Sequence, residues 1–161
     1  MRKFLPFICS CFFISCLSSY SSLNKNPSNG PYTNLLLGSQ ESLIWPVLGS
    51  VSSKYGMRNK AFHSGIDIRA KKGSNIFAVQ KGIVEFSGYI RGYGKTVILK
   101  HKDFRTLYAH CSALLVRDRQ KIRQGQTIAK VGTTGKSTGP HLHFEYQDLE
   151  GRSINPEDML P

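Results

Sequence analysis

The sequence predicts an all-β fold, a small antiparallel sheet or sandwich, for the part of the chain that follows Trp45. Short apolar segments recur there between glycines and turn-forming residues. Several of these segments alternate apolar and polar residues, and none keeps a 3.6-residue period long enough to favour a helix. The chain has 161 residues, a length typical of one domain after a leader and a linker are set aside.

Six segments carry the strand pattern. In chain order they are SNIFAV (74–79), GIVEFSG (82–88), KTVILKH (95–101), FRTLYAH (104–110), QTIAKVG (126–132) and HLHFEYQ (141–147). Stretches such as KKGS, SGYIRGYG and TTGKSTGP lie between them and indicate tight turns. Near the C-terminus, Asn155 and Pro156 predict a brief helical turn, because asparagine caps helices and proline fits the first helical position.

The N-terminus has the pattern of a secretory signal peptide, which we place at residues 1–15. Arg2 and Lys3 precede the apolar run FLPFICSCFFI, which is too short for a permanent membrane span. The run ends at FISC, which resembles the lipobox of bacterial lipoproteins, so either Cys16 is lipidated or ordinary cleavage occurs nearby. Residues 16–44, rich in Ser, Asn and Pro, predict a flexible linker before a domain at 45–161.

The charge balance is strongly basic. The formal net charge is +12, and removal of Arg2 and Lys3 with the leader leaves 20 basic against 10 acidic residues, or +10. Such an excess favours a polyanionic partner, whether nucleic acid, a lipid surface or an anionic cell wall. An export signal argues against nucleic acid and predicts a location in the periplasm or cell envelope, with a lipid anchor if Cys16 is modified.

Cysteine usage excludes a disulfide framework in the mature protein. Cys9, Cys11 and Cys16 lie in or beside the leader, which leaves only Cys111 in the predicted domain. A lone cysteine of this kind is either a catalytic nucleophile or a small buried hydrophobe, and the second interpretation is favoured.

The segment HLHFEYQ places its two histidines and its glutamate on one face of a strand. Because side chains alternate along a strand, His141, His143 and Glu145 share one face, while Leu142, Phe144 and Tyr146 share the other. Two imidazoles and a carboxylate are poor core material. The pattern therefore predicts that this face opens into a cleft, where it binds a metal or transfers protons.

A second cluster lies in HSGID, residues 63–67. His63 and Asp67 can converge on one ion if the turn around Gly65 is tight. With one histidine of the 141/143 pair they give two nitrogens and one oxygen, the three-ligand pattern of a catalytic zinc site with one open position. In FRTLYAH, strand alternation predicts that His110 shares a face with Phe104, Thr106 and Tyr108. His110 could bind a substrate oxygen or relay a proton if its strand lies nearby, and otherwise it is structural. We interpret His101 as a structural or surface residue.

The order of four separated blocks, YGMR, HSGID, YAH and GKSTGPHLHFE, strongly resembles the lysostaphin/LytM-type zinc metallopeptidases that cut bacterial peptidoglycan. The resemblance covers nearly all of residues 45–161. It implies that Zn²⁺ is bound by His63, Asp67 and His143, and that His110 and His141 are catalytic without binding the metal. It also implies a narrow groove on an antiparallel scaffold. Glu145 is expected to support this site rather than to act as the base.

The middle of the chain carries a second likeness. The run from RGYGKTVILKH through LLVRDRQKIRQGQTIAKVG looks like the NlpD-type division lipoproteins, which usually have an incomplete zinc site and activate separate amidases. Here every ligand and both histidines are present, which favours a peptidase acting on stem or cross-link peptides of peptidoglycan. The alternative is an adaptor that binds a cell-wall amidase and switches it on.

Overall fold

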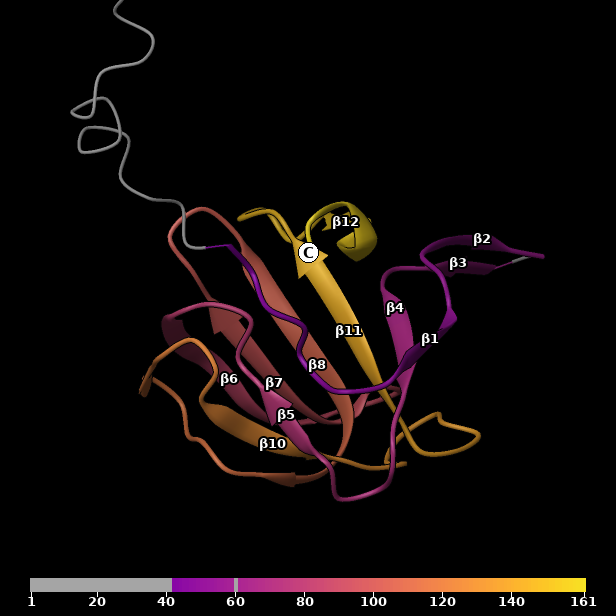
Figure 1. Ribbon diagram of the computed structural model, residues 1–161, viewed down its shortest axis with the longest axis horizontal. Helices are drawn as coiled ribbons and strands as arrows, with labels where there is room; N and C mark the ends of the chain where they lie inside the picture. The colour runs from indigo at the N-terminus through magenta and orange to yellow at the C-terminus, as the bar shows by residue number, and fades with distance from the viewer. Residues whose placement is uncertain (1–41, 60) are drawn as a thin grey trace, which may run out of the picture. The chain divides into compact units, whose positions relative to one another are not determined.

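The structure is a computed structural model that describes residues 42–59 and 61–161 (Figure 1). The predicted signal peptide at 1–15, Cys16 and most of the predicted linker lie outside the described residues. In the described part of that linker, the backbone N–H of Ile44 donates to the carbonyl of Val79 (3.2 Å), and Leu43 packs against the hydrophobic core.

The fold is almost entirely β, as predicted. The strands are β1 (Ser50–Ser53), β2 (Gly56–Arg58), β3 (Ala61–His63), β4 (Ile66–Arg69), β5 (Asn75–Phe77), β6 (Gly82–Ile90), β7 (Gly94–Lys100), β8 (Arg105–Leu114), β9 (Lys121–Ile122), β10 (Thr127–Val131), β11 (His141–Gln147) and β12 (Ser153–Ile154). The predicted turn near the C-terminus is the 3₁₀ helix η1 (Pro156–Asp158), capped by the side chain of Asn155. Across residues 42–59 and 61–161, no helix has the length and apolar character to cross a membrane.

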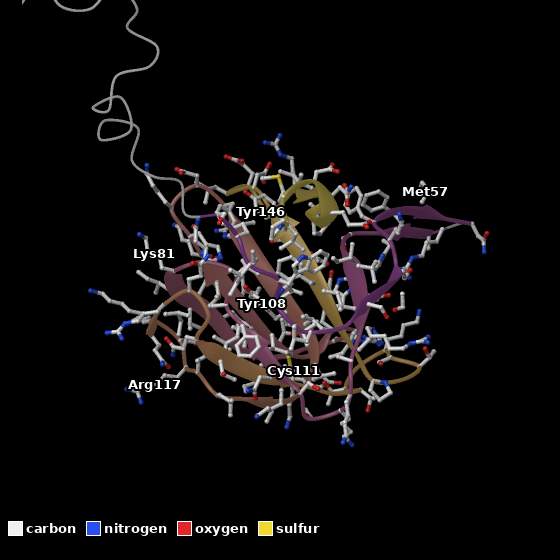
Figure 2. All side chains as sticks on the ribbon, viewed as in Figure 1. Met57, Lys81, Tyr108, Cys111, Arg117 and Tyr146 are labelled. Atoms are coloured by element: carbon white, nitrogen blue, oxygen red, sulfur yellow. The ribbon has the colours of Figure 1, made fainter. Side chains whose placement is uncertain are left out.

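One antiparallel sheet organises these strands in the order β1-β4-β11-β8-β7-β6-β9 (Figure 1). The long strand β8 pairs with β11 through its first half and with β10 through its second half. Strand β5 pairs with β10, and β2 and β3 form a separate two-stranded ribbon that projects beyond β1 and β4. Exposed Met57 lies on this ribbon (Figure 2).

Strand β11 has the two faces that the sequence predicts, but the polar face is not open as expected. Leu142 and Phe144 are fully buried in the hydrophobic core, and on the other face His143 and Glu145 are also buried, which leaves His141 as its partly exposed member. In the register of the neighbouring strand β4, His143 lies opposite Asp67. This pairing brings a histidine of one predicted cluster beside the aspartate of the other, from positions 76 residues apart.

The face predicted for His110 from strand alternation is wrong. We expected His110 to share a face with Tyr108, but Tyr108 packs against Phe144 in the core, whereas the His110 ring contacts His141. The β7–β8 register shifts here, and His110 has a left-handed backbone with φ of 59°. Because this irregularity interrupts the two-residue alternation, His110 turns to the face that carries the other histidines.

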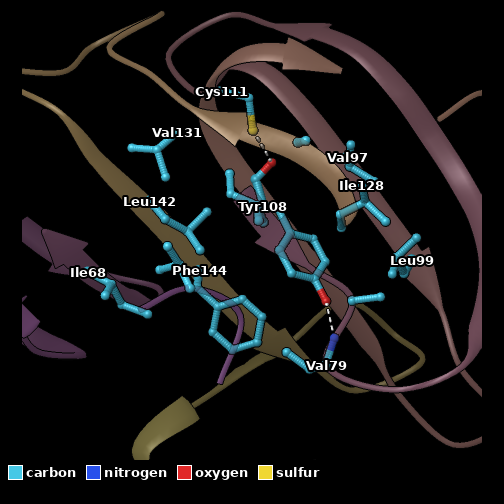
Figure 3. Close-up of a cluster of buried hydrophobic side chains, with 14 of the residues drawn as sticks. Ile68, Val79, Val97, Leu99, Tyr108, Cys111, Ile128, Val131, Leu142 and Phe144 are labelled. Atoms are coloured by element: carbon cyan, nitrogen blue, oxygen red, sulfur yellow. Dashed lines mark hydrogen bonds between the residues drawn. The ribbon is translucent and has the colours of Figure 1, made fainter. Parts of the chain in front are cut away.

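Tyr108 occupies the centre of the core, beside Leu142, Phe144 and Ile128 (Figure 3). Its side chain is fully buried, and its hydroxyl accepts a hydrogen bond from the Val79 backbone N–H at 3.1 Å. The same hydroxyl lies 3.0 Å from the Thr106 hydroxyl. Burial raises the pKa of Tyr108 well above its usual value, so the phenol stays protonated.

Removing this hydroxyl is expected to destabilise the fold. Tyr108→Phe leaves the buried N–H of Val79 without its acceptor, which should lower the free energy of unfolding by about 1–3 kcal/mol. Urea unfolding measures the change, with Tyr89→Phe as the control because Tyr89 is 66% exposed and should change stability little. Equal stability of the two variants would contradict the role assigned to the Val79–Tyr108 bond.

Cys111 is a core residue rather than a nucleophile. Its side chain is fully buried, and its thiol donates weakly to the Tyr108 carbonyl at 3.6 Å (Figure 3). Burial raises the pKa of the Cys111 thiol to about 12. A protonated thiol with no access to solvent is unreactive, which supports the interpretation of Cys111 as a small buried hydrophobe.

His101 is structural, in agreement with the sequence interpretation. It is buried and stacks on Phe104 with a ring-centroid distance of 4.3 Å. Its Nδ1 donates to the carbonyl of Lys81, and its Nε2 lies beside the Thr106 hydroxyl, both at 2.8 Å. Burial lowers the pKa of His101 below its ordinary value of 6.5.

Acid is therefore expected to weaken the fold through His101. Because its folded pKa lies below its unfolded pKa, its contribution to stability is complete above about pH 6.5 and falls as the pH drops below that value. Urea unfolding of the native protein and of His101→Gln at pH 7.5 and pH 5.0 measures this contribution. The stability difference between the two proteins should shrink at pH 5.0, and a constant difference would contradict the assignment.

Candidate metal centre

Strands β4 and β11 and the β3–β4 turn bring His63, Asp67 and His143 together. The turn passes very close to β11: a Cβ atom on Gly65 would lie 2.2 Å from the carbonyl oxygen of Phe144. Only glycine permits this approach. The tight turn that HSGID requires is therefore present, and it places the side chains of His63 and Asp67 beside His143.

Three donor atoms converge at this point. Asp67 Oδ1 lies 3.1 Å from His63 Nε2 and 2.9 Å from His143 Nδ1, and the two nitrogens are 3.1 Å apart. His141, the other histidine of the pair, is more distant, with its Nε2 3.8 Å from Asp67 Oδ1. Sequence periodicity left open which histidine of the pair completes the set, and the geometry favours His143.

The remaining ring nitrogens of the two histidines have other partners. His63 Nδ1 lies 2.8 Å from the Lys54 carbonyl, and His143 Nε2 lies 2.9 Å from Glu145 Oε1. When each of these nitrogens carries the proton, the lone pairs of His63 Nε2 and His143 Nδ1 face Asp67. Two neutral imidazole nitrogens and one carboxylate oxygen are a donor set that suits zinc, so the residues present fit the metal.

The charges of the cluster are mutually stabilised. Burial opposes ionisation of Asp67, but His143, His63 and Arg58 outweigh it and hold the pKa of Asp67 far below its usual range. Burial lowers the pKa of His63. Burial also opposes protonation of His143, yet hydrogen bonds with Asp67 and Glu145 raise its pKa. Asp67 is thus an anion at neutral pH, as metal binding requires.

Glu145 is a buried carboxylate with several donors around it. It is 1% exposed, and its Oε1 accepts from His143, from Ser64 Oγ at 2.5 Å and from Tyr93 Oη at 2.7 Å. Gln147 donates to the other oxygen at 2.6 Å. Burial opposes its charge, but these partners lower the pKa of Glu145, while burial and Glu145 itself raise the pKa of Tyr93 to about 12. Glu145 therefore fixes the ring orientation and tautomer of His143.

Replacing this carboxylate is expected to weaken metal binding. Glu145→Gln keeps the size of the side chain but removes the charge that orients the His143 N–H, so zinc affinity should fall by about 10- to 100-fold. Competition with a chromogenic chelator measures the affinity. Glu150→Gln is the control because Glu150 is largely exposed. Equal zinc affinities in the two variants would show that Glu145 does not position His143.

His110 and His141 flank the donor cluster without joining it. The Nδ1 of His141 is 2.8 Å from the Gly139 carbonyl, and the Nδ1 of His110 is 2.8 Å from the Thr134 carbonyl. Their rings are 4.8 Å apart. A proton on each Nδ1 leaves each Nε2 as a lone pair able to accept a proton. Burial lowers the pKa of His110, which keeps that ring neutral at pH 7.

The five predicted site residues thus meet in one place, although they come from β3, β4, β8 and β11. They line a cleft of about 570 Å³ whose other walls include Phe62, Tyr93 and Lys136. Prediction from the residues alone missed three contributors. Arg58 donates to Asp67 Oδ2 at 3.1 Å and also lies against His63 Nδ1, and Ser64 and Tyr93 bind Glu145. Arg58 lies in the motif YGMR and Tyr93 in the motif RGYG. The position of these motifs in the sequence does not by itself indicate that either residue contacts the site.

Antiparallel strands thus hold a His63–Asp67–His143 cluster that could bind a metal ion, with two further histidines beside it. The sequence profile of peptidase family M23 matches residues 61–156. The chain belongs to this family, and it has the fold and the peptidoglycan-hydrolase-type domain that the lysostaphin/LytM resemblance implied.

Of two similar curated proteins, one is named as an activator of hydrolases and the other as a peptidase. Murein hydrolase activator NlpD of Escherichia coli is 41% identical over 119 residues, covering 73% of this chain and 31% of the relative. DD-carboxypeptidase/endopeptidase Mpg of Neisseria meningitidis is 39% identical over 117 residues, covering 68% of this chain and 27% of the relative. The chain therefore spans about a third of the length of these relatives.

Solved structures share the architecture. A zinc-containing peptidase from Vibrio cholerae has a TM-score of 0.67 and 27% identity, covering 71% of this chain and 39% of that one. The antimicrobial peptidase lysostaphin from Staphylococcus simulans also has a TM-score of 0.67 and 27% identity, covering 73% of this chain and 51% of that one.

Proposed function

We propose that the protein is a zinc-dependent peptidase that hydrolyses peptide bonds in the stem or cross-link peptides of peptidoglycan during wall remodelling or division. The observation that carries the proposal is the completeness of the site. Three donor atoms face one point within 3.1 Å of one another, and two further histidines lie beside them with an Nε2 lone pair each. An endopeptidase and a carboxypeptidase would use the same groups.

His63, Asp67 and His143 would hold the metal. When bound, zinc supplies Lewis-acid polarisation of a peptide carbonyl and makes water more acidic. His141 and His110 accept a proton from the attacking water, deliver one to the leaving amine, or donate a hydrogen bond to the carbonyl oxygen as it gains charge. Glu145 orients His143, and the carbonyls of Gly139 and Thr134 hold the two flanking rings.

The digestion of purified peptidoglycan tests this proposal. The protein is incubated with peptidoglycan, and the released fragments are identified by mass spectrometry. A chelator-treated sample and the variant His141→Ala are the controls. Opening of cross-links, or loss of a terminal residue, that both controls abolish is the expected result and names the bond. No cleavage by folded, zinc-loaded protein would contradict the proposal.

A second candidate is that the chain activates a cell-wall amidase. The 41% identity to a murein hydrolase activator favours this role. Activation of an amidase by binding would not require a metal in this protein. Dye release from labelled peptidoglycan by a purified amidase, with and without this protein, tests it. Activation that persists in His141→Ala would support an adaptor role separate from hydrolysis, whereas unchanged dye release would exclude it for that amidase.

The proposed setting is the periplasm or cell envelope. The leader at 1–15 directs export, and a lipid on Cys16 would hold the protein at a membrane. The formal charge of +10 that remains without Arg2 and Lys3 favours residence beside an anionic wall. Mass spectrometry of the protein purified from membranes tests the lipid directly, since acylation adds a defined mass to an N-terminal Cys16.

A further inference from the structure

A second groove adjoins the metal centre, and His110 is not among the residues that line it. It has a volume of about 1080 Å³ and shares Asp67, Thr138 and His141 with the metal cleft. Strands β1 and β4 and the loop before β11 form its walls. The remaining lining residues are Gly49, Ser50, Ser52, Ser53, Arg69, Ala70, Lys71, Lys72, Gly139 and Pro140.

The side chains of this groove are cationic on one wall. Arg69 follows Asp67 by two residues on β4, and it pairs with His141 in the β4–β11 register. Side chains two apart on a strand share a face, so Arg69 lies on the face that carries Asp67 and His141. Lys71 and Lys72 continue the same wall, and all three basic residues are exposed.

These charges have no carboxylate partner within residues 42–59 and 61–161. The ion pairs of the described chain involve other basic residues. The single acidic residue lining the groove is Asp67, whose charge is already engaged by Arg58, His63 and His143. The three cations are therefore free to attract an anion supplied from outside.

The rest of the groove fits a peptide with small or polar side chains. Its walls consist mainly of glycine, serine, threonine and alanine, which leave room for a backbone and offer hydroxyl groups to it. A peptide lying there would reach His141 and the metal centre at one end and meet Arg69, Lys71 and Lys72 along its length.

We propose that this groove binds a free carboxylate of the substrate peptide through Arg69, Lys71 and Lys72. The protein therefore selects anionic peptides over their amidated forms. The proposal deepens the proposed function and rests on it, because it assigns the groove to the substrate of the same site. Arg69 has the leading role, since its planar guanidinium can bind a carboxylate through two parallel hydrogen bonds.

Binding of soluble muropeptides tests the proposal separately from hydrolysis. Muropeptides are released from purified peptidoglycan, and half of the sample is treated with carbodiimide and ammonia, which converts free carboxylates to amides. Calorimetry measures the affinity of both samples for zinc-loaded protein carrying His110→Ala, because His110 lines the metal cleft and not this groove. The untreated peptides should bind about tenfold more tightly, the order expected for a few exposed charge pairs.

Two charge-matched triple variants locate the effect. Arg69→Gln/Lys71→Gln/Lys72→Gln should bind both samples alike, whereas Lys100→Gln/Lys102→Gln/Lys121→Gln removes three exposed cations elsewhere and should keep the preference. The single variant Arg69→Gln should lose part of it, which keeps the test valid if the triple variant fails to fold. Raising the salt concentration should also reduce the preference, because exposed charges are screened.

The outcomes separate this inference from the proposed function. Equal binding of both samples to the native groove, or a preference that survives loss of the three cations, would overturn the carboxylate site. If the protein cleaves wall peptides but ignores amidation, the peptidase stands and this inference fails. If it prefers free carboxylates but the protein with His110 intact cleaves neither sample, the groove stands and the peptidase proposal fails.

Discussion

Asp67→Asn is expected to abolish stoichiometric zinc binding and, with it, peptide hydrolysis. Asp67 is the sole anion among the three proposed ligands, and its Oδ1 lies within 3.1 Å of both donor nitrogens. The amide keeps the size of the side chain but presents a neutral oxygen, a much weaker ligand for a divalent cation. The substitution also removes the charge that pairs with Arg58.

Zinc per chain, measured by elemental analysis after dialysis, checks this expectation. Native protein should retain one zinc and Asp67→Asn none. Asp103→Asn is the control, since Asp103 is largely exposed and far from the cluster in sequence. A variant at position 67 that keeps one zinc and full activity would show that the ligand set is wrong.

His141→Ala is expected to separate metal binding from catalysis. His141 Nε2 is 3.8 Å from Asp67 Oδ1, and the Gly139 carbonyl fixes the ring through Nδ1. Removal of a positioned acid–base group typically lowers the rate by about 10²- to 10⁴-fold. The zinc content should stay at one per chain, because the three ligand donors remain in place.

Hydrolysis rate and zinc content must be measured on the same preparation. His110→Ala should behave in the same direction, and comparing the two variants shows which ring contributes more. Loss of zinc in His141→Ala would instead make His141 a ligand. An unchanged rate with zinc retained would remove His141 from the catalytic group.

Much of the site could be predicted because it depends on local rules. Strand periodicity places His141, His143 and Glu145 on one face, and β11 has that arrangement. A four-residue spacing around a glycine predicts convergence of His63 and Asp67, and the close approach of Gly65 to β11 explains why the turn is tight enough. Choosing His143 over His141 required either the family resemblance or the geometry.

The remaining parts depend on contacts between distant segments. The face of His110 was predicted wrongly because His110 itself has a left-handed backbone conformation, which interrupts the alternation of side chains along β8. A histidine in a sequence does not by itself indicate this conformation. Tyr93 reaches Glu145 from a position 52 residues away, and Arg58 reaches Asp67 from a separate ribbon. Neither contact follows from spacing or periodicity, so the support around Glu145 and Asp67 could be read only from the fold.

Titration of the metal-free protein with zinc tests whether hydrolysis depends on one bound metal ion per chain. Zinc is added in fractions of one equivalent, and hydrolysis of purified peptidoglycan peptides is followed by mass spectrometry at each step. The rate should rise in proportion to bound zinc, reach a plateau at one zinc per chain and stay at background in Asp67→Asn. One tightly bound zinc with no hydrolysis, or hydrolysis that is independent of zinc, would contradict the assignment of the protein as a zinc peptidase.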